Sequence, residues 1–176
     1  MDPVLTLILG SLIILAIIAA NGFFVAQEFA YMSVDRVRLQ TAAKAGDRAA
    51  ARALQVTRRT SFMLSGAQLG ITITGLLIGY VAEPLVGQGL GVLLGGVGVP
   101  SAVSITVGTI AALFISTIAT MLFAELFPKN YTIAAPMKTA RWLAASTQLY
   151  LRLFGWLIHF FEYSSNAILK VFGIEP

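Results

Sequence analysis

Three long apolar segments, residues 4–27, 61–82 and 102–127, constrain this chain more than any other feature. A helix of about 20 residues crosses the hydrocarbon core of a bilayer, and each segment is long enough to do so. Charged residues make up 11% of the sequence, against roughly 25% in soluble domains, and the mean hydropathy is +0.84. The sequence therefore predicts an all-α membrane protein with three transmembrane helices.

The basic residues predict an orientation. All 12 Lys and Arg lie in residues 36–59 or after the third segment, and residues 83–101 contain none. Short loops that cross a membrane avoid Lys and Arg, so we expect the N-terminus outside and the C-terminus in the cytosol. The basic residues, and with them the net charge of +4, are therefore interpreted as determinants of topology that also contact anionic lipid headgroups. No nucleic-acid partner is predicted. Without cysteine, disulfides and thiolate ligands are excluded.

Two further segments favour amphipathic juxtamembrane helices. Residues 34–59 are basic and rich in alanine, and Gly46-Asp47 suggests two short helices, about 34–45 and 48–59. Residues 138–172 are also amphipathic. Residues 142–161 have the apolarity of a fourth span, but Arg152 at their centre favours a surface helix, or a pair broken at Gly155. The glycine-rich residues 87–100 are predicted to form an outside loop.

Two carboxylates near the ends of spans are candidate cation ligands. Glu125 ends the third span and Glu28 follows the first. An acid at that depth is costly unless it is protonated, paired or bound to a cation. Pro128 cannot donate a backbone hydrogen bond, so we expect a helix break that exposes carbonyl oxygens near Glu125. This combination suits Mg²⁺ or Na⁺. The alternative is ion pairing with Lys129 or Arg36.

Polar residues and glycines on the same helices add to this pattern. Gln68 and Thr72 are four residues apart, and Asn21 and Glu28 are seven apart, so each pair shares a helix face. These faces could converge on an ion or merely form hydrogen bonds between helices. Glycine pairs at 66/70 and 75/79 permit close helix approach within one chain or across a dimer. No nucleophile–base pair is evident, and no enzyme activity is predicted.

Four motifs together resemble one family. Residues 21–30 (NGFFVAQEFA), 67–72 (AQLGIT), 83–84 (EP) and 124–129 (AELFPK) are similar, in order and spacing, to the membrane domain of the bacterial CorC and cyclin M family. The resemblance covers essentially all of residues 1–176. It implies a homodimer in the bacterial inner (plasma) membrane and cytosolic CBS domains that follow in the full-length protein but are absent from this chain. It also implies Mg²⁺ efflux coupled to Na⁺, with Glu125 as a metal ligand.

The sequence departs from the transporting branches of this family at the expected site. Val25 and Ile71 offer no side-chain oxygen where those branches often carry Ser and Asn. An ion site would then be rebuilt from neighbouring polar residues and backbone carbonyls. The alternative is a membrane sensor or scaffold that does not transport and binds a membrane or envelope partner. The predicted ion-binding residues are Glu125, Glu28, Gln27, Gln68, Thr72 and Asn21.

Overall fold

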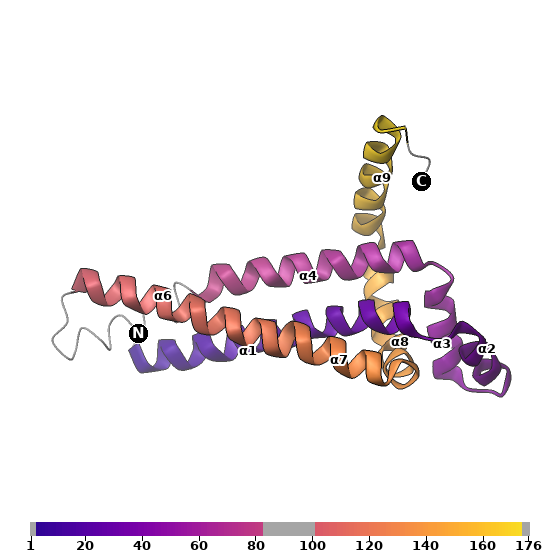
Figure 1. Ribbon diagram of the computed structural model, residues 1–176, viewed down its shortest axis with the longest axis horizontal. Coiled ribbons are helices and arrows are strands. Elements are labelled where there is room, and N and C mark those ends of the chain that lie inside the picture. Colours follow the sequence, from indigo (N-terminus) through magenta and orange to yellow (C-terminus); the bar gives the residue numbers. More distant parts are fainter. Residues whose placement is uncertain (1–2, 83–100, 174–176) are drawn as a thin grey trace. The chain divides into compact units, whose positions relative to one another are not determined.

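The computed structural model describes residues 3–82 and 101–173, and these residues are almost entirely helical, with no strand among them. The glycine-rich segment at 87–100 and the Glu83-Pro84 motif lie outside the described residues. In chain order (Figure 1) the elements are α1 (Pro3–Ser33), α2 (Arg36–Lys44), α3 (Arg48–Thr57), α4 (Thr60–Ala82), α6 (Ser101–Ala119), η2 (Thr120–Leu126), α7 (Phe127–Ala134), α8 (Pro136–Leu153) and α9 (Gly155–Val171).

Three stretches of helix are long and apolar enough to cross a membrane: Ile8–Ser33, Thr60–Val81 and Val103–Ala134. Large apolar side chains along them are exposed, among them Leu76 and Phe114. Such a surface is stable when it faces lipid, because hydrocarbon tails are as apolar as these side chains. The predicted fold class, an all-α membrane protein with three spanning helices, is confirmed.

The third apolar stretch continues past the predicted break at Pro128. Pro128 is the second residue of α7, which follows η2 without interruption, so its missing N–H leaves a carbonyl of the preceding turn without a helical donor. The departure from regular α-helix lies upstream instead, in η2, which is a π-helix over Thr120–Leu126. The helix therefore continues through Pro128, and its irregular turn lies beside Glu125; that carbonyl oxygens near Glu125 serve an ion stays a prediction.

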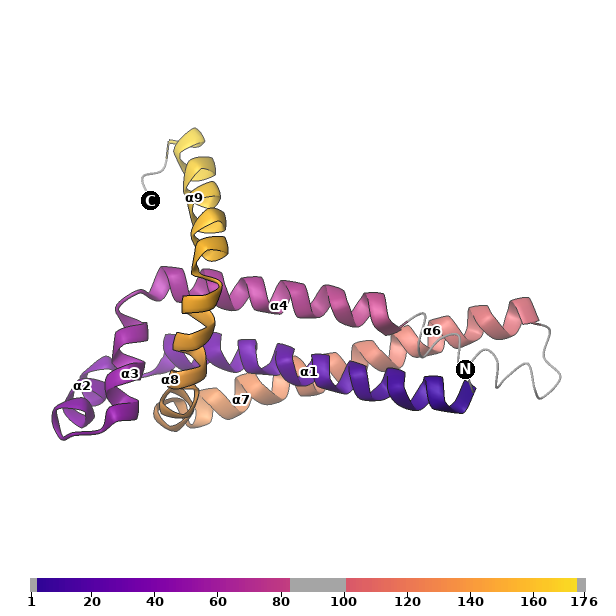
Figure 2. The same ribbon diagram turned by 180° about the vertical axis from the view of Figure 1, so that it is seen from behind.

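The described chain divides into two compact units. The first consists of residues 1–23 and 71–128, and the second of residues 24–70 and 129–176. In the first unit, the helical segments run alongside one another in both views (Figures 1 and 2). A core cluster described there consists of Ile14, Ile18, Ile78 and Ala124, with Ile17, Val81 and Ala119 packed against them.

In the second unit, the predicted pair of short helices is present as α2 and α3. The carboxylate of Asp35 caps α2, and the carboxylate of Asp47 caps α3. Each accepts hydrogen bonds from backbone N–H groups in the first turn of the helix that follows it. Gly46 connects the helices with φ of 95°, a conformation that favours glycine. Helix α3 packs on α8 through small buried side chains: Ala50 and Ala53 on α3, and Ala140 and Ala144 on α8.

The C-terminal segment is a pair of helices rather than one. Helix α8 ends at Leu153, and α9 begins at Gly155, as the predicted break at Gly155 required. Among the described residues, neither helix is a candidate span. Ile158 of α9 is fully buried, whereas Trp156 is 74% exposed. This one-sided burial fits the predicted amphipathic helix, whose position at the membrane surface stays a prediction.

Candidate functional site

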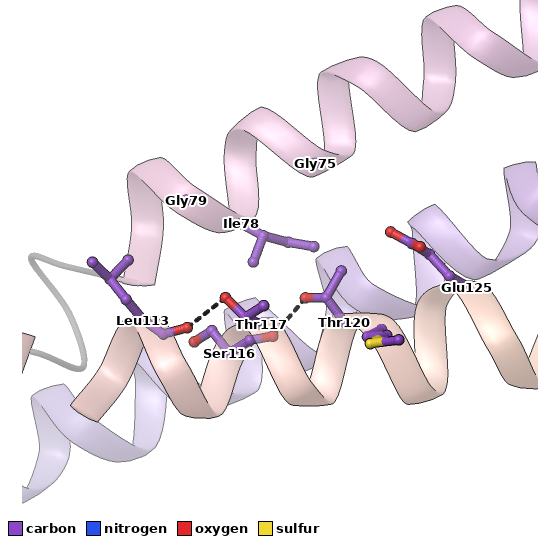
Figure 3. A pocket seen from close by; sticks show the side chains of 9 residues that line it. Gly75, Ile78, Gly79, Leu113, Ser116, Thr117, Thr120 and Glu125 are labelled. Atoms are coloured by element: carbon purple, nitrogen blue, oxygen red, sulfur yellow. Dashed lines mark hydrogen bonds between the residues drawn. The ribbon is translucent and has the colours of Figure 1, made fainter. Parts of the chain in front are cut away.

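A pocket in the first unit contains Glu125. It has a volume of about 420 Å³ and lies between α4 and the continuous helix formed by α6 and η2 (Figure 3). Glu125 is the acidic residue in its lining, which also contains three hydroxyl side chains and two glycines. The lining residues are Gly75, Ile78, Gly79, Leu113, Ser116, Thr117, Thr120, Met121 and Glu125.

The threonines of this pocket are oriented by their own helix. Thr117 Oγ1 donates to the carbonyl of Leu113, and Thr120 Oγ1 donates to the carbonyl of Ser116, each over 2.7 Å (Figure 3). Each hydroxyl proton is therefore used, while the lone pairs of each oxygen remain available. A hydroxyl in this state is a neutral oxygen ligand for a cation.

The π-helix determines which face carries Glu125. The N–H of Phe127 donates to the carbonyl of Leu122, five residues back, instead of to the fourth residue back. Glu125 follows Thr120 by five positions, which would place the two side chains on different faces of a regular helix with 3.6 residues per turn. The wider turn of η2 brings Glu125 to the pocket, and its side chain projects toward α4 in Figure 3.

Asn21 brings a buried acceptor close to the same pocket. Its side chain is 3% exposed, and Nδ2 donates to the carbonyl of Ile71 over 3.2 Å. Oδ1 has no hydrogen-bond partner within the described residues. A Cβ added at Gly75, which lines the pocket, would lie 3.9 Å from Asn21 Nδ2. An unpaired buried acceptor costs about 1–3 kcal/mol, so this oxygen favours a donor or a cation beside it.

The glycine after Asn21 explains part of the first motif. A Cβ at Gly22 would lie 3.1 Å from Pro128 Cγ and 3.4 Å from the carbonyl oxygen of Phe123. A side chain at this position would require its neighbours to shift by a few tenths of an ångström, so glycine favours this approach of α1 to the chain around Glu125. The start of the first motif, at Gly22, is therefore packed against residues 123–128 within the first unit.

In the second unit, the predicted ligands Glu28, Gln68 and Gln27 bond to other side chains. Gln68 Nε2 donates to Glu28 Oε1 over 2.8 Å. Gln27 is fully buried, and its Oε1 accepts a 3.4 Å hydrogen bond from Thr147 Oγ1. The amide oxygen thus accepts one long hydrogen bond, while Gln27 Nε2 lacks a partner among the described residues.

The alternative partners of the two acids are engaged elsewhere. Lys129 Nζ lies 4.9 Å from the centre of the Phe29 ring, and Arg36 Nη2 donates to Thr60 Oγ1 over 2.7 Å. Neither Glu28 nor Glu125 takes part in the ion pair found among the described residues, Arg141 with Asp47, or in the contact of His159 with Glu162.

The remaining predictions about the site have mixed outcomes. Thr72 is exposed and does not line the pocket. Val25 is buried and offers no oxygen. Within residues 3–82 and 101–173, no group of three or more His, Asp or Glu side chains is arranged to hold a metal ion. Sequence reasoning missed Ser116 and Thr117 as pocket residues, although Ser116 and Thr120 are four apart and so share a helix face.

Residues 12–176 match the family model of the cyclin M transmembrane N-terminal domain. The chain belongs to this family. An uncharacterized protein of Mycobacterium tuberculosis is 38% identical over 167 residues, which cover 94% of this chain and 47% of that protein. A UPF0053 protein of Synechocystis is 31% identical over 167 residues, covering 92% of this chain and 36% of the relative. UPF0053 protein YhdT of Bacillus subtilis is 31% identical over 169 residues, covering 96% and 37%.

This cyclin M-type chain spans less than half the length of each of these relatives. The family match and the three apolar helices make it a membrane protein. The matched region includes the whole pocket around Glu125 and all the predicted ligands.

Proposed function

We propose that this chain is the membrane domain of a divalent-cation transporter with Mg²⁺ as its substrate and Na⁺ as the coupled ion. One observation carries the proposal: Glu125 lies in an apolar candidate span, in a pocket with Ser116, Thr117 and Thr120, without an ion pair among the described residues. A carboxylate in such a place is expensive unless a cation or proton offsets its charge. The family to which the chain belongs supports the same conclusion.

The chemistry of the pocket fits a hydrated Mg²⁺ better than a fully stripped one. Mg²⁺ binds oxygen, loses its water reluctantly and is usually held by one or two carboxylates. A water molecule takes up about 30 Å³ of liquid volume, so a pocket of about 420 Å³ has room for the ion with its waters. In this account Glu125 supplies the charge, and the threonine hydroxyls and Asn21 Oδ1 contact the ion or its waters.

The residues of the second unit are proposed to act differently. The carboxylate of Glu28 is held by Gln68, and Gln27 is held by Thr147. We propose that these side chains fasten helices to one another and affect transport only indirectly. Thr72 is not needed as a ligand in this account.

The test is an ion-flux assay with the purified chain in proteoliposomes, in which Mg²⁺ and Na⁺ gradients are varied separately. A Mg²⁺ flux that follows the Na⁺ gradient would support both parts of the proposal. A Mg²⁺ flux that ignores Na⁺ would remove the coupling but keep the substrate. No Mg²⁺ flux under any gradient would contradict the transporter.

The second candidate is a non-transporting membrane sensor or scaffold. The specific observation in its favour is the sparse ligand set: Val25 and Ile71 offer no side-chain oxygen, and the described residues contain no cluster of three metal-binding side chains. Under this alternative, Mg²⁺ would neither cross the membrane nor stabilise the protein against heat. A Mg²⁺-dependent rise in melting temperature that requires Glu125 would count against it.

The proposed assembly is a homodimer in which a second copy covers the face of Gly75 and Gly79, the same face that lines the Glu125 pocket. Gly66 and Gly70 are already filled within the chain, by Leu151 and by the ring of Phe24, whereas a Cβ at Gly79 would meet nothing within 4 Å. Crosslinking in mild detergent should trap a dimer in the parent chain and not in Gly79→Leu. An undiminished dimer in Gly79→Leu would exclude this face.

The proposed orientation places the N-terminus outside and the 12 basic residues in the cytosol, with CBS domains following in the full-length protein. The chain contains no cysteine, so single cysteines report topology cleanly. A cysteine at Arg48 should react with an impermeant reagent only after the membrane is opened. Labelling of intact cells at that position would reverse the orientation.

A further inference from the structure

Two arginines of the second unit share a pocket. Arg59 and Arg152 line a cavity of about 310 Å³ together with Gln55, Val56, Phe62, Gln148 and Leu151. Arg152 lies in the last turn of α8, and the guanidinium of Arg59 lies 5.8 Å from the centre of the Phe62 ring. Two permanent positive charges are therefore held beside one partly polar cavity.

These two charges are not neutralised by acids of the described chain. Arg141 stands on the same side of α8 as Arg152, since the two are 11 residues, or three turns, apart. Arg141 pairs with Asp47, whereas neither Arg152 nor Arg59 takes part in an ion pair among the described residues. The carboxylate of Glu162 bonds instead to Ser61 and His159.

The polar side chains of the cavity are fixed in place. Gln148 Nε2 donates to the carbonyl of Arg52 over 3.1 Å and to Gln55 Oε1 over 2.9 Å. The side chain of Gln55 therefore lines the cavity with its amide oxygen already hydrogen-bonded to Gln148. Arginine forks and amide N–H groups are the donors that recognise phosphate oxygens.

The position of the pocket along the chain indicates where the anion comes from. Arg59 directly precedes the candidate span Thr60–Val81. Helix α9 begins three residues after Arg152 and exposes Trp156 and Phe160. Aromatic side chains of this kind favour the boundary between water and lipid. A cationic cavity at the end of a span and beside exposed aromatics suits a lipid headgroup with its acyl chains in the bilayer.

We propose that the cavity of Arg59 and Arg152 binds the phosphate of an anionic phospholipid headgroup. The site is separate from the Glu125 pocket and does not depend on ion transport. The two guanidinium groups contact the phosphate, and the apolar surfaces of Phe62 and α9 contact the glycerol backbone and upper acyl chain.

The experiment is a native mass spectrometry titration of the detergent-solubilised chain with phosphatidylglycerol and, separately, with phosphatidylcholine. We expect tight binding of phosphatidylglycerol only. Arg59→Gln and Arg152→Gln should each weaken it about five-fold, the loss expected for about one hydrogen bond to the phosphate. Arg59→Lys keeps the positive charge but removes the planar guanidinium that can donate two parallel hydrogen bonds. We expect it to lower the affinity for phosphatidylglycerol by less than Arg59→Gln does. Circular dichroism checks that each variant remains helical.

Arg58→Gln is the matched control, because Arg58 adjoins Arg59 in sequence, is exposed and does not line the cavity. Its phosphatidylglycerol affinity should be unchanged. Equal losses for Arg58→Gln and Arg59→Gln would show diffuse attraction to a basic surface and overturn the discrete site. Displacement of the lipid by excess inorganic phosphate would show a free-anion site, and equal binding of phosphatidylcholine would show no charge selectivity; either result also overturns the proposal.

Discussion

In the first unit, the pocket around Glu125 lies among helices that carry no Lys or Arg, whereas the second unit contains all 12 basic residues of the chain. A carboxylate in an apolar span is costly unless its charge is offset. In the first unit, Glu125 is exposed in a pocket that also contains three hydroxyl side chains, and it takes part in no ion pair among the described residues. The second unit binds its polar groups to one another through caps, amides and one Arg–Asp pair. In the proposed function, the pocket of the first unit accepts a cation and the second unit anchors the helices.

The largest contrast in stability is expected between two glycines of α4. In the second unit, a Cβ at Gly70 would overlap the ring of Phe24, whereas a Cβ at Gly79 in the first unit would enter open space. Gly70→Ala should destabilise the folded chain by about 1–3 kcal/mol through overpacking. Gly79→Ala should be neutral or slightly stabilising, because alanine is the better helix former. Thermal unfolding in one detergent measures both, and equal effects would contradict the tighter packing of the second unit.

A smaller effect is expected at Tyr150, where α8 contacts α4 inside the second unit. Tyr150 Oη donates to the carbonyl of Gly66 over 2.9 Å. Tyr150→Phe should cost about 0.5–1.5 kcal/mol, the usual value of one hydrogen bond. Tyr163→Phe is the control, because Tyr163 is 77% exposed.

Tyr150 also gives the stability a pH dependence. Burial raises the pKa of Tyr150 above its ordinary value of 10.0, since the charged phenolate is disfavoured there. The native state then holds the proton more tightly than the unfolded state. This contribution is fully present below pH 10 and is lost as the pH rises through the folded-state pKa. Thermal unfolding above pH 10 measures this contribution. If the stability of Tyr150→Phe falls in parallel with that of the parent chain, the fall is due to other groups.

The sequence predicted the helical fold well because its signals are local. Long apolar segments predicted the spans, and the Gly46-Asp47 pair predicted the boundary between α2 and α3 by the conformations and capping groups those residues favour. Gly155 similarly marked the break between α8 and α9.

The candidate site was less predictable because its geometry depends on a non-standard helix. Counting at 3.6 residues per turn separates Glu125 from Thr120, and only the π-helix over Thr120–Leu126 brings both to one pocket. The residue types in this segment do not predict a helical turn with i→i+5 hydrogen bonds. The pairing of Gln68 with Glu28 was anticipated as one of two alternatives, a hydrogen bond between helices, but the choice needed side-chain positions.

The most direct test of the account compares two carboxylates in the Mg²⁺ flux assay, Glu125 in the first unit and Glu28 in the second. Each is changed to glutamine, which preserves size and removes one charge. Glu125→Gln should lower Mg²⁺ flux by at least about ten-fold. Mutation of residues that only hydrogen-bond to metal ligands already costs about ten-fold or more in metal affinity or activity, and a direct ligand should cost at least as much. Glu28→Gln should retain most of the flux, because glutamine at that position still accepts the hydrogen bond from Gln68. Wild-type flux in Glu125→Gln, with loss confined to Glu28→Gln, would contradict the account.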